Sequence, residues 1–187
     1  RVIHAAAVTS RSAIYRATAP VNLEGTRQLL DLLEKCTELR QFTHLSDIAV
    51  AGNYRGSFSE EMLFEGQSFT TAYAESKAAA EGLVRERLGE LPTTIIRPAN
   101  LIGHSRTGAI TKVDGLYHLI LFLLRVAKLP RLLRRIPTPV GGKDQIIDAL
   151  PWDFVADVVV ALSSDENQLG QCITVGSDNP LTIENWL

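Results

Sequence analysis

The stretch TTAYAESKAAAEGLVRERL (residues 70–88) has the composition of an α-helix and stands between two apolar stretches. Ala, Glu, Lys, Arg and Leu dominate it, and neither Gly nor Pro interrupts its first two turns. The flanking stretches QFTHLSDIAVAG (41–52) and PTTIIRPANLIG (92–103) resemble buried strands, the second broken at Pro98. This alternation predicts right-handed βαβ units, with a parallel sheet covered by helices on both faces.

The chain before this region continues the same alternation. VIHAAAV (2–8) is a short apolar run, which predicts a buried parallel strand whose small residues let a ligand approach the backbone. PVNLEGTRQLLDLLEK (20–35) predicts an amphipathic helix, whose buried stripe consists of Leu29, Leu30 and Leu33.

The chain after this region is also expected to return to the sheet. QIIDALPWDFVADVVVALSS (145–164) predicts a strand entering a helix, with Asp153 as N-cap and Phe154 among the inward-facing residues. GQCITVGSDNPLT (170–182) predicts a strand and a turn, after which Thr182 caps a last helix.

Tyr73 and Lys77 are four residues apart, so a helix places them on the same face. An ammonium group close to a phenol favours the phenolate and brings the phenol pKa toward neutral pH. Tyr73 is therefore a candidate proton donor to a developing alkoxide. The alternative is a surface tyrosine beside a solvated lysine, which is the commoner origin of such a pair.

Composition indicates a globular chain of 187 residues with 45% hydrophobic residues and a formal net charge of −2. This hydrophobic content and this charge together argue against a nucleic-acid partner and against disorder. Cys36, expected on a helix, and Cys172, expected on a strand, predict buried free thiols in a reducing, cytoplasmic compartment. The four histidines have no metal-ligand spacing, so no metal is expected, and His104 is expected to hydrogen-bond within a loop.

The segment GLYHLILFLLRVAKLPRLLRRIP (115–137) begins as a strongly apolar helix and ends in basic residues. Its uncharged run is too short to span a membrane. Three interpretations remain open: a core helix with a cationic end, a wall facing an acyl chain or carrier protein, and peripheral membrane contact, which is not favoured. The basic run consists of Arg125, Lys128, Arg131, Arg134 and Arg135.

The motifs HAA (4–6), NLEGTRQLL (22–30), YAESK (73–77) and RPANLIG (97–103) occur in the order found in one superfamily. With them, the chain resembles the extended short-chain dehydrogenase/reductase superfamily over almost its whole length. The continuation of the last motif, through Ser105–Gly108 and a following DG turn, is most similar to the thioester-reductase and fatty-acyl-CoA-reductase branch.

The resemblance implies a catalytic group. Tyr73 is expected to be the acid, and Lys77 to hold the nicotinamide ribose hydroxyls and to lower the pKa of Tyr73. Ser46 is expected to hydrogen-bond the substrate oxygen. The family usually carries this hydroxyl one place later, where this chain has Asp47. Ser46 therefore serves this role through a local bulge, or Asp47 has a different part, or activity is weakened.

The resemblance also implies NADP or NAD as the cofactor, with NADP favoured. Its site is expected to include Tyr73 and Lys77, together with Ala5 and Ala6 at the end of the first strand. Asn22 is expected behind the site, and Pro98, Ala99 and Asn100 in the turn after the third strand.

The expected fold is a Rossmann-like doubly wound parallel sheet with a small C-terminal substrate-binding lobe. Residues 1–113 are expected to form the later part of the dinucleotide-binding core, and 114–187 mainly the lobe, with 146–162 returning to the core. The glycine-rich pyrophosphate turn is absent from the chain, so preceding βαβ units are expected to carry it.

The expected function is reduction of an acyl thioester, linked to CoA or a carrier protein, or of the carbonyl derived from it. Hydride transfer from NAD(P)H with Tyr73 as proton donor is the expected reaction. One alternative is a sugar-nucleotide or sterol epimerase or dehydrogenase of the same superfamily. An alternative of another class is a non-catalytic dinucleotide-sensing protein, which Asp47 keeps open.

Overall fold

The computed structural model describes residues 1–9, 14–111, 113, 116–127 and 146–182. The chain forms two compact units: the first contains residues 1–99 and 155–175, and the second the remainder. The units thus separate after Ala99, whereas the sequence predicted a boundary at 113. The reason is that the chain leaves the main sheet directly after its third strand and pairs elsewhere.

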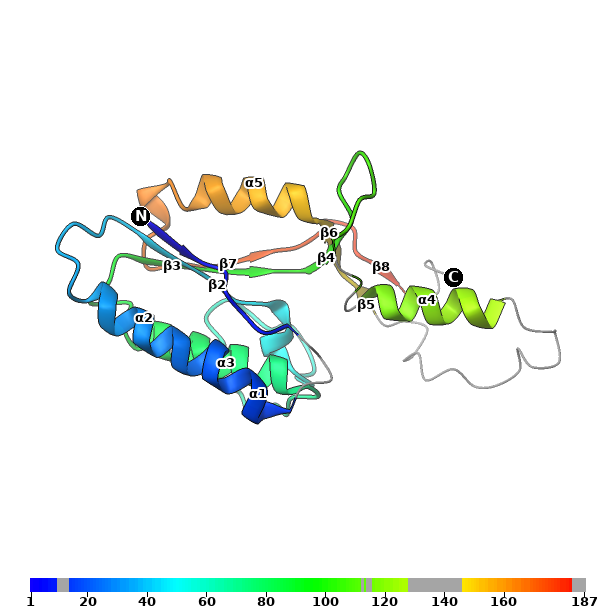
Figure 1. Cartoon of the computed structure of the whole chain (residues 1–187), viewed down its shortest axis with the longest axis horizontal. Coiled ribbons are helices and arrows are strands. Elements are labelled where there is room, and N and C mark those ends of the chain that lie inside the picture. Colours follow the sequence, from blue (N-terminus) through cyan, green and yellow to red (C-terminus); the bar gives the residue numbers. More distant parts are fainter. Residues whose placement is uncertain (10–13, 112, 114–115, 128–145, 183–187) are drawn as a thin grey trace. The chain divides into compact units, whose positions relative to one another are not determined.

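The first unit contains a four-stranded, fully parallel sheet (Figure 1). Its strands are β1 (Val2–His4), β2 (Phe42–Leu45), β3 (Thr93–Pro98) and β7 (Cys172–Val175), arranged in this order across the sheet. Every residue of β3 is buried, as expected for a central strand with helices on both faces. The predicted parallel sheet is therefore confirmed.

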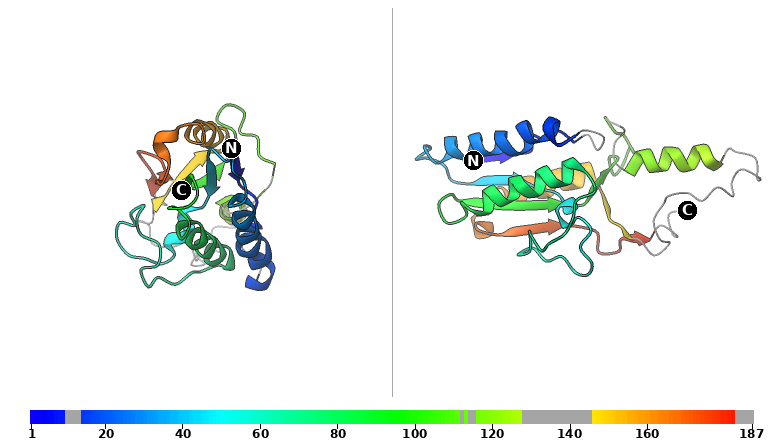
Figure 2. Two further views of the ribbon diagram at one scale, coloured as in Figure 1. Left: turned by 90° about the vertical axis from the view of Figure 1, so that its left-hand side faces the viewer. Right: turned by 90° about the horizontal axis from the view of Figure 1, so that it is seen from below.

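Helices cover both faces of this sheet (Figures 1 and 2). On one face lie α1 (Tyr15–Ala19), η1 (Pro20–Glu24), α2 (Gly25–Leu33) and α3 (Ala72–Arg85). On the other lies α5 (Trp152–Leu162), whose residues from Val155 onward belong to this unit.

The helical region before α2 begins earlier than predicted, at Tyr15 and not at Pro20. Pro20 has no backbone N–H to continue the α-helical hydrogen bonds. The chain passes this position through the π-helical turn η1, in which the N–H of Gly25 donates to the carbonyl oxygen of Pro20.

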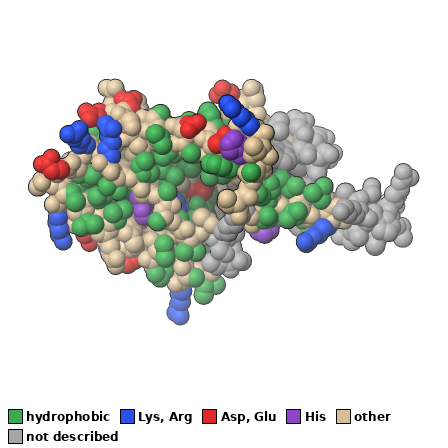
Figure 3. Space-filling model, turned by 45° about the horizontal axis from the view of Figure 1, so that its top comes forward, with side chains coloured by type: hydrophobic (Ala, Val, Ile, Leu, Met, Phe, Trp, Pro, Cys, Tyr) green, Lys and Arg blue, Asp and Glu red, His purple; other side chains and the backbone are tan. Residues whose placement is uncertain are grey.

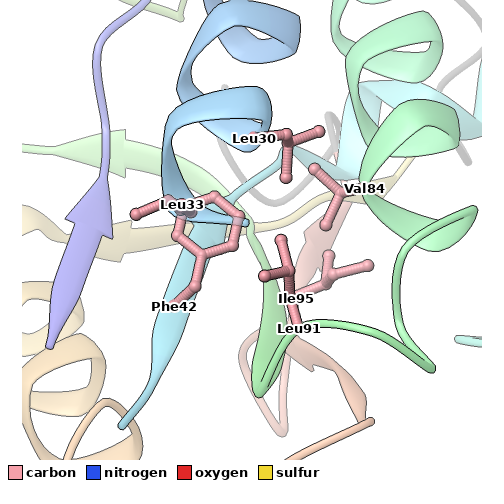
Figure 4. Close-up of a cluster of buried hydrophobic side chains, with 6 residues drawn as sticks. All are labelled: Leu30, Leu33, Phe42, Val84, Leu91 and Ile95. Atoms are coloured by element: carbon pink, nitrogen blue, oxygen red, sulfur yellow. The ribbon is translucent and has the colours of Figure 1, made fainter. Parts of the chain in front are cut away.

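The core of this unit lies between the sheet and the helices α2 and α3 (Figure 4). Leu30 and Leu33 are buried there and Leu29 is partly buried, which confirms the predicted stripe of the helix. Removing such apolar side chains from water contributes about 1.5–3 kcal/mol each. The buried members are Leu30, Leu33, Phe42, Val84, Leu91 and Ile95.

Three local predictions were wrong. Cys36 is exposed in the turn that follows α2, because that helix ends at Leu33. Asp153 lies inside the first turn of α5 and not at its N-cap, because the helix begins at Trp152. Phe154 is 48% exposed, whereas Val155, the next residue of the same helix, is buried. Cys172 lies on a strand as predicted, partly buried.

The second unit is built from two small sheets and one helix. Strand β4 (Asn100–Ile102) pairs in parallel with β6 (Ala149–Pro151), and β5 (Ile146–Ile147) pairs antiparallel with β8 (Leu181–Thr182). The helix expected after Thr182 lies outside the described residues.

The apolar helix of this unit, α4 (Leu116–Ala127), carries hydrophobic side chains on its surface (Figure 3). Leu121, Phe122 and Leu124 are exposed, and so is Arg125, the first residue of the predicted basic run. The other four basic residues lie outside the described part of the chain. Within that part, no helix combines the length and the apolar character needed to cross a membrane.

Candidate active site

The helix α3 carries the predicted Tyr73/Lys77 pair to the end of β2. Its N-terminus is capped by Thr71, whose side-chain oxygen accepts from the N–H of Ala74 at 3.1 Å. Tyr73 lies in the first turn, and Lys77 follows one turn later on the buried side. The Lys77 ammonium donates to the carbonyl oxygen of Leu45, the last residue of β2. Ligands of parallel sheets bind at these carboxyl ends.

The Tyr73 hydroxyl donates a hydrogen bond to Oδ2 of Asp47 at 2.8 Å. The other carboxylate oxygen of Asp47, Oδ1, accepts from the N–H of Ala49 at 2.8 Å and caps the short helix η2 (Ile48–Ala51). Asp47 is therefore held from both sides, by a backbone N–H and by the phenol. The group beside Tyr73 at the end of β2 is a carboxylate.

The predicted role of Ser46 does not agree with its geometry. Ser46 is 4% exposed, and its hydroxyl donates to Oε2 of Glu81 at 2.5 Å. Successive side chains near the end of a strand point to different sides. Asp47 consequently meets Tyr73, while Ser46 is directed into the interior, and no bulge brings the Ser46 hydroxyl to the phenol.

Glu81 is the centre of a buried ionic network below the site. It is fully buried and pairs with Arg97 through Oε1 and Nη2 at 2.7 Å and with Arg85 at 2.8 Å. Burial raises the pKa of Glu81, but the hydrogen bonds and charge of Arg97, with the bonds from Ser46 and Arg85, outweigh it and lower that pKa. Arg97 also donates to the carbonyl oxygen of Met62 at 2.6 Å, which ties the loop before α3 to the core.

Lys77 is the buried cation of the site, with 5% exposure. Burial lowers the pKa of Lys77 to about 8, although the charges of Asp47 and Glu81 act in the opposite direction. The ammonium can donate three hydrogen bonds, and Leu45 O is its one hydrogen-bond acceptor within the described residues. Two donors therefore remain at the carboxyl end of β2, which fits the predicted contact with the hydroxyl pair of a nicotinamide ribose.

Two histidines lie beside Lys77. His4 and His44 are paired across β1 and β2, with ring centroids 5.5 Å apart. Burial, followed by the charge of Lys77, lowers the pKa of both, and the pKa of His44 falls well below the usual value. Both rings are therefore neutral at physiological pH. Nε2 of His4 lies 3.0 Å from the Thr26 hydroxyl.

Asn22 connects the segment after β1 to α3. Its Oδ1 accepts from the N–H of Val8 at 2.7 Å, and its Nδ2 donates to the Ser76 hydroxyl at 2.9 Å. Ser76 in turn donates to the carbonyl oxygen of Tyr73 at 2.9 Å. The structure thus connects Asn22 to α3 by way of Ser76, in a supporting position.

The other predicted cofactor residues lie at strand ends. Ala5 and Ala6 follow β1 and are exposed, so their small side chains leave the backbone accessible. Pro98 ends β3, and the N–H of Ala99 donates to the carbonyl oxygen of Val175 at 2.8 Å. Asn100 begins β4, where its side-chain amide donates to the carbonyl oxygen of Asp148 at 2.9 Å.

The sequence of the chain matches a known family. The model of the family described as male sterility protein covers residues 1–159. The chain belongs to this family. This confirms the predicted branch of the extended short-chain dehydrogenase/reductase superfamily, the Rossmann-like fold and the binding of NAD or NADP.

Individual relatives agree with the family. L-2-aminoadipate reductase of Saccharomyces cerevisiae is 31% identical over 81% of this chain and 11% of its own length. Alcohol-forming fatty acyl-CoA reductase of Simmondsia chinensis is 22% identical over 89% of this chain and 43% of its own.

The crystal structure of the terminal R domain from the myxalamid PKS-NRPS biosynthetic pathway superposes with a TM-score of 0.81 at 29% identity. The superposed region covers 96% of this chain and 43% of the R-domain chain. This chain therefore spans less than half the length of each of these proteins.

The second unit contains a polar cluster that includes His104. Both the N–H and the hydroxyl of Ser105 donate to Asp153, at 2.8 and 2.6 Å. Nδ1 of His104 accepts from the N–H of Arg106 at 3.1 Å, in agreement with the loop role predicted from the sequence. The hydroxyl of Ser105 is hydrogen-bonded to the carboxylate and not to the histidine, so the cluster fastens a loop and does not activate a nucleophile.

The sequence contained signals for some functional residues that it did not assign. These are Glu81 and Arg85, which follow the assigned Lys77 at intervals of four residues, so the three charges lie along one face of α3. Apolar Ala74 and Ala78 flank the first two of them, which indicated that the charged face is buried. No sequence signal identifies Arg97 as the partner of Glu81, because Arg97 lies on β3 and not on α3.

Proposed function

We propose that the chain is part of an NAD(P)-dependent reductase that acts on an acyl thioester, or on the carbonyl compound derived from it. The observation that carries the proposal is the Tyr73/Lys77 pair at the carboxyl end of β2, in a member of the male sterility protein family. The names of the relatives, which include two reductases and a terminal R domain, support the same class of reaction.

In this proposal, Tyr73 gives the proton and Lys77 positions the cofactor. A bound reduced nicotinamide supplies the hydride that reduces the carbonyl carbon. The Tyr73 hydroxyl protonates the oxygen as negative charge develops on it. The free N–H donors of Lys77 hold the ribose hydroxyls. Ala5 and Ala6 leave room for the middle of the dinucleotide.

Backbone groups complete the proposed cofactor site. The turn from Pro98 to Asn100 follows β3 and supplies groups for the nicotinamide amide, while Asn22 supports α3 from behind through Ser76. Ser46 takes no part in the reaction, because its hydroxyl is bonded to Glu81.

The proposed substrate is an acyl group linked to CoA or to a carrier protein, with NADP preferred to NAD. The exposed apolar residues Leu121, Phe122 and Leu124 of α4 offer a surface for an acyl chain. An apolar wall distinguishes chain lengths by about 1–3 kcal/mol per methylene, so preference among them should be graded.

The test is a turnover assay of the whole protein with NADPH or NADH and a series of acyl-CoA and acyl-carrier thioesters. Tyr73→Phe should lower kcat by about 10²–10⁴-fold and leave dinucleotide affinity unchanged, as expected for loss of a positioned acid. Tyr54→Phe, at a partly exposed tyrosine in the loop before α3, is the matched control and should behave like wild type.

Near wild-type turnover by Tyr73→Phe would contradict the proton-donor role. Efficient turnover of a sugar nucleotide or a sterol, with none of a thioester, would replace the proposed substrate class. Dinucleotide binding without turnover of any of these substrates would point to a sensing protein.

A further inference from the structure

The hydrogen bond between Tyr73 and Asp47 determines where the phenol proton lies. An ionised carboxylate can only accept hydrogen bonds, and a phenol has a single O–H to donate. In the structure this O–H points to Oδ2 of Asp47 at 2.8 Å, while Oδ1 already accepts from Ala49. The proton that Tyr73 would give to a substrate is therefore bound to a carboxylate.

This arrangement differs from one in which a serine or threonine hydroxyl stands beside Tyr73. A hydroxyl can both donate and accept, so it can donate to a substrate oxygen or to the phenol oxygen. The Asp47 carboxylate cannot donate until it is protonated, and its negative charge disfavours a phenolate nearby. Asp47 thus opposes the effect expected of Lys77, which favours the phenolate.

We propose that Asp47 is a positioning residue that keeps Tyr73 protonated and makes proton donation by Tyr73 depend on prior protonation of Asp47. The dependence on protonation rests on the proposed function, in which Tyr73 is the proton donor. That Asp47 keeps Tyr73 protonated does not depend on the proposed function.

The proton transfers balance as follows in the reductive direction. A proton from solvent binds Asp47 and releases the Tyr73 O–H from it. The carbonyl carbon takes a hydride from the reduced nicotinamide dinucleotide, its C=O π bond breaks, and the oxygen takes the proton of Tyr73. The Asp47 O–H bond then breaks as its proton passes to the Tyr73 oxygen, which leaves the carboxylate and the neutral phenol of the starting state.

The charged and titratable groups around this pair come from α3 and from the strands β1, β2 and β3, the last through Arg97. Lys77 and Glu81 lie on α3, and His4 and His44 lie on β1 and β2. Both histidines are neutral at physiological pH, so the charges that act are those of Lys77, Asp47 and Glu81, and Glu81 is paired with Arg97 and Arg85. Asp47 is the counter-charge of Lys77 that directly contacts Tyr73.

The first test measures the ionisation of Tyr73 without any substrate. The ultraviolet absorbance of phenolate is followed against pH in the whole protein, and the signal of Tyr73 is the difference between each protein and its Tyr73→Phe derivative. Asp47→Asn and Asp47→Ser remove the charge while keeping a side chain that caps η2. Glu75→Gln removes an exposed carboxylate from the same helix and is the matched control.

Tyr73 should ionise at a pH lower by about one unit or more in Asp47→Asn and in Asp47→Ser, because a nearby carboxylate no longer opposes the phenolate. Glu75→Gln should titrate like wild type. An unchanged midpoint in both Asp47 variants would overturn the proposal, and agreement between the two excludes an artefact of either side chain.

The second test is the pH profile of reductive turnover with NADPH and a medium-chain acyl-CoA. The wild-type rate should fall as the pH rises above its optimum, since proton donation by Tyr73 needs a protonated Asp47. Asp47→Ser should lose this limb. Parallel profiles of wild type and Asp47→Ser would overturn the gating of proton donation.

The two proposals fail in distinguishable ways. A shifted Tyr73 midpoint without turnover of any thioester supports the role of Asp47 and contradicts the reductase function. Turnover by a protein whose Tyr73 midpoint is insensitive to Asp47 supports the reductase and overturns the role of Asp47.

Discussion

Lys77→Met should change how the stability of the protein depends on pH. The Lys77 ammonium is buried, and its pKa is lowered to about 8 in the folded state from 10.5 in a solvated lysine. Between these two values the unfolded chain binds more protons than the folded one. The free energy of unfolding of the wild type therefore rises with pH across this window. Below pH 8 the cost of burying the charge is fully present.

The magnitude follows from the difference between the two pKa values. A difference of roughly 2.5 pH units corresponds to about 3 kcal/mol of destabilisation at low pH, at ~1.4 kcal/mol per unit. Between pH 7 and pH 9.5, linkage predicts that about 2 kcal/mol of this cost is relieved. Lys77→Met has no charge to bury, so it should lack this gain.

The assay is denaturant unfolding of wild type, Lys77→Met and Lys35→Met at several pH values. Lys35 is exposed and serves as the control for the loss of one lysine. Removing the Lys77 bond to the carbonyl oxygen of Leu45 adds a cost that does not depend on pH, so it cancels from the comparison of slopes. Wild type should gain about 2 kcal/mol relative to Lys77→Met over this range. Parallel curves for these two proteins would refute the reasoning.

Two further predictions concern stability and are also measured by denaturant unfolding. Glu81→Gln should destabilise the protein by about 3–5 kcal/mol, because it leaves the buried guanidinium of Arg97 without its counter-charge. The control is Arg27→Gln, which removes an exposed ion pair and should cost about 1 kcal/mol or less. Equal losses of unfolding free energy in the two variants would show that the buried Glu81–Arg97 pair contributes no more to stability than an exposed ion pair. Gly52→Ala should cost about 1–3 kcal/mol more than Gly66→Ala: both positions have positive φ, but only at Gly52 would the new Cβ lie 2.5 Å from a backbone oxygen. The same cost at both glycines would leave backbone strain as the whole explanation.

Local patterns were sufficient to predict the main sheet and the helix α3 that carries Tyr73 and Lys77. Tyr73 and Lys77 share a face because helical spacing is short-range geometry, and β3 is buried along its whole length because both sides of the sheet are covered. The same local reasoning located the buried leucines of α2.

Pairings between distant parts of the chain account for one error and for one partner that the sequence did not predict. The separation of the units after Ala99 depends on β4 pairing with β6, a strand almost fifty residues further along the chain. The partner of Glu81 comes from β3, which no spacing along α3 reveals. The other errors were local. Helix bounds that differ by a few residues misplaced Cys36 and Asp153. For Ser46, strand alternation already placed it opposite Asp47, and its assignment to the site gave a motif more weight than that geometry.

The position of β7 in the sheet has a consequence for the synthesis of the protein. β3 pairs with β7 on one side, and the paired residues Ile95 and Cys172 are separated by 77 positions in the chain. At about 5–20 residues per second, a ribosome needs roughly 4–15 s to make the intervening segment. During that interval one edge of β3 has no partner strand, although every residue of this strand is buried in the folded protein. The nascent chain therefore carries an aggregation-prone edge until β7 emerges. A bound chaperone would cover this edge, and faster synthesis would shorten the time for which it is exposed.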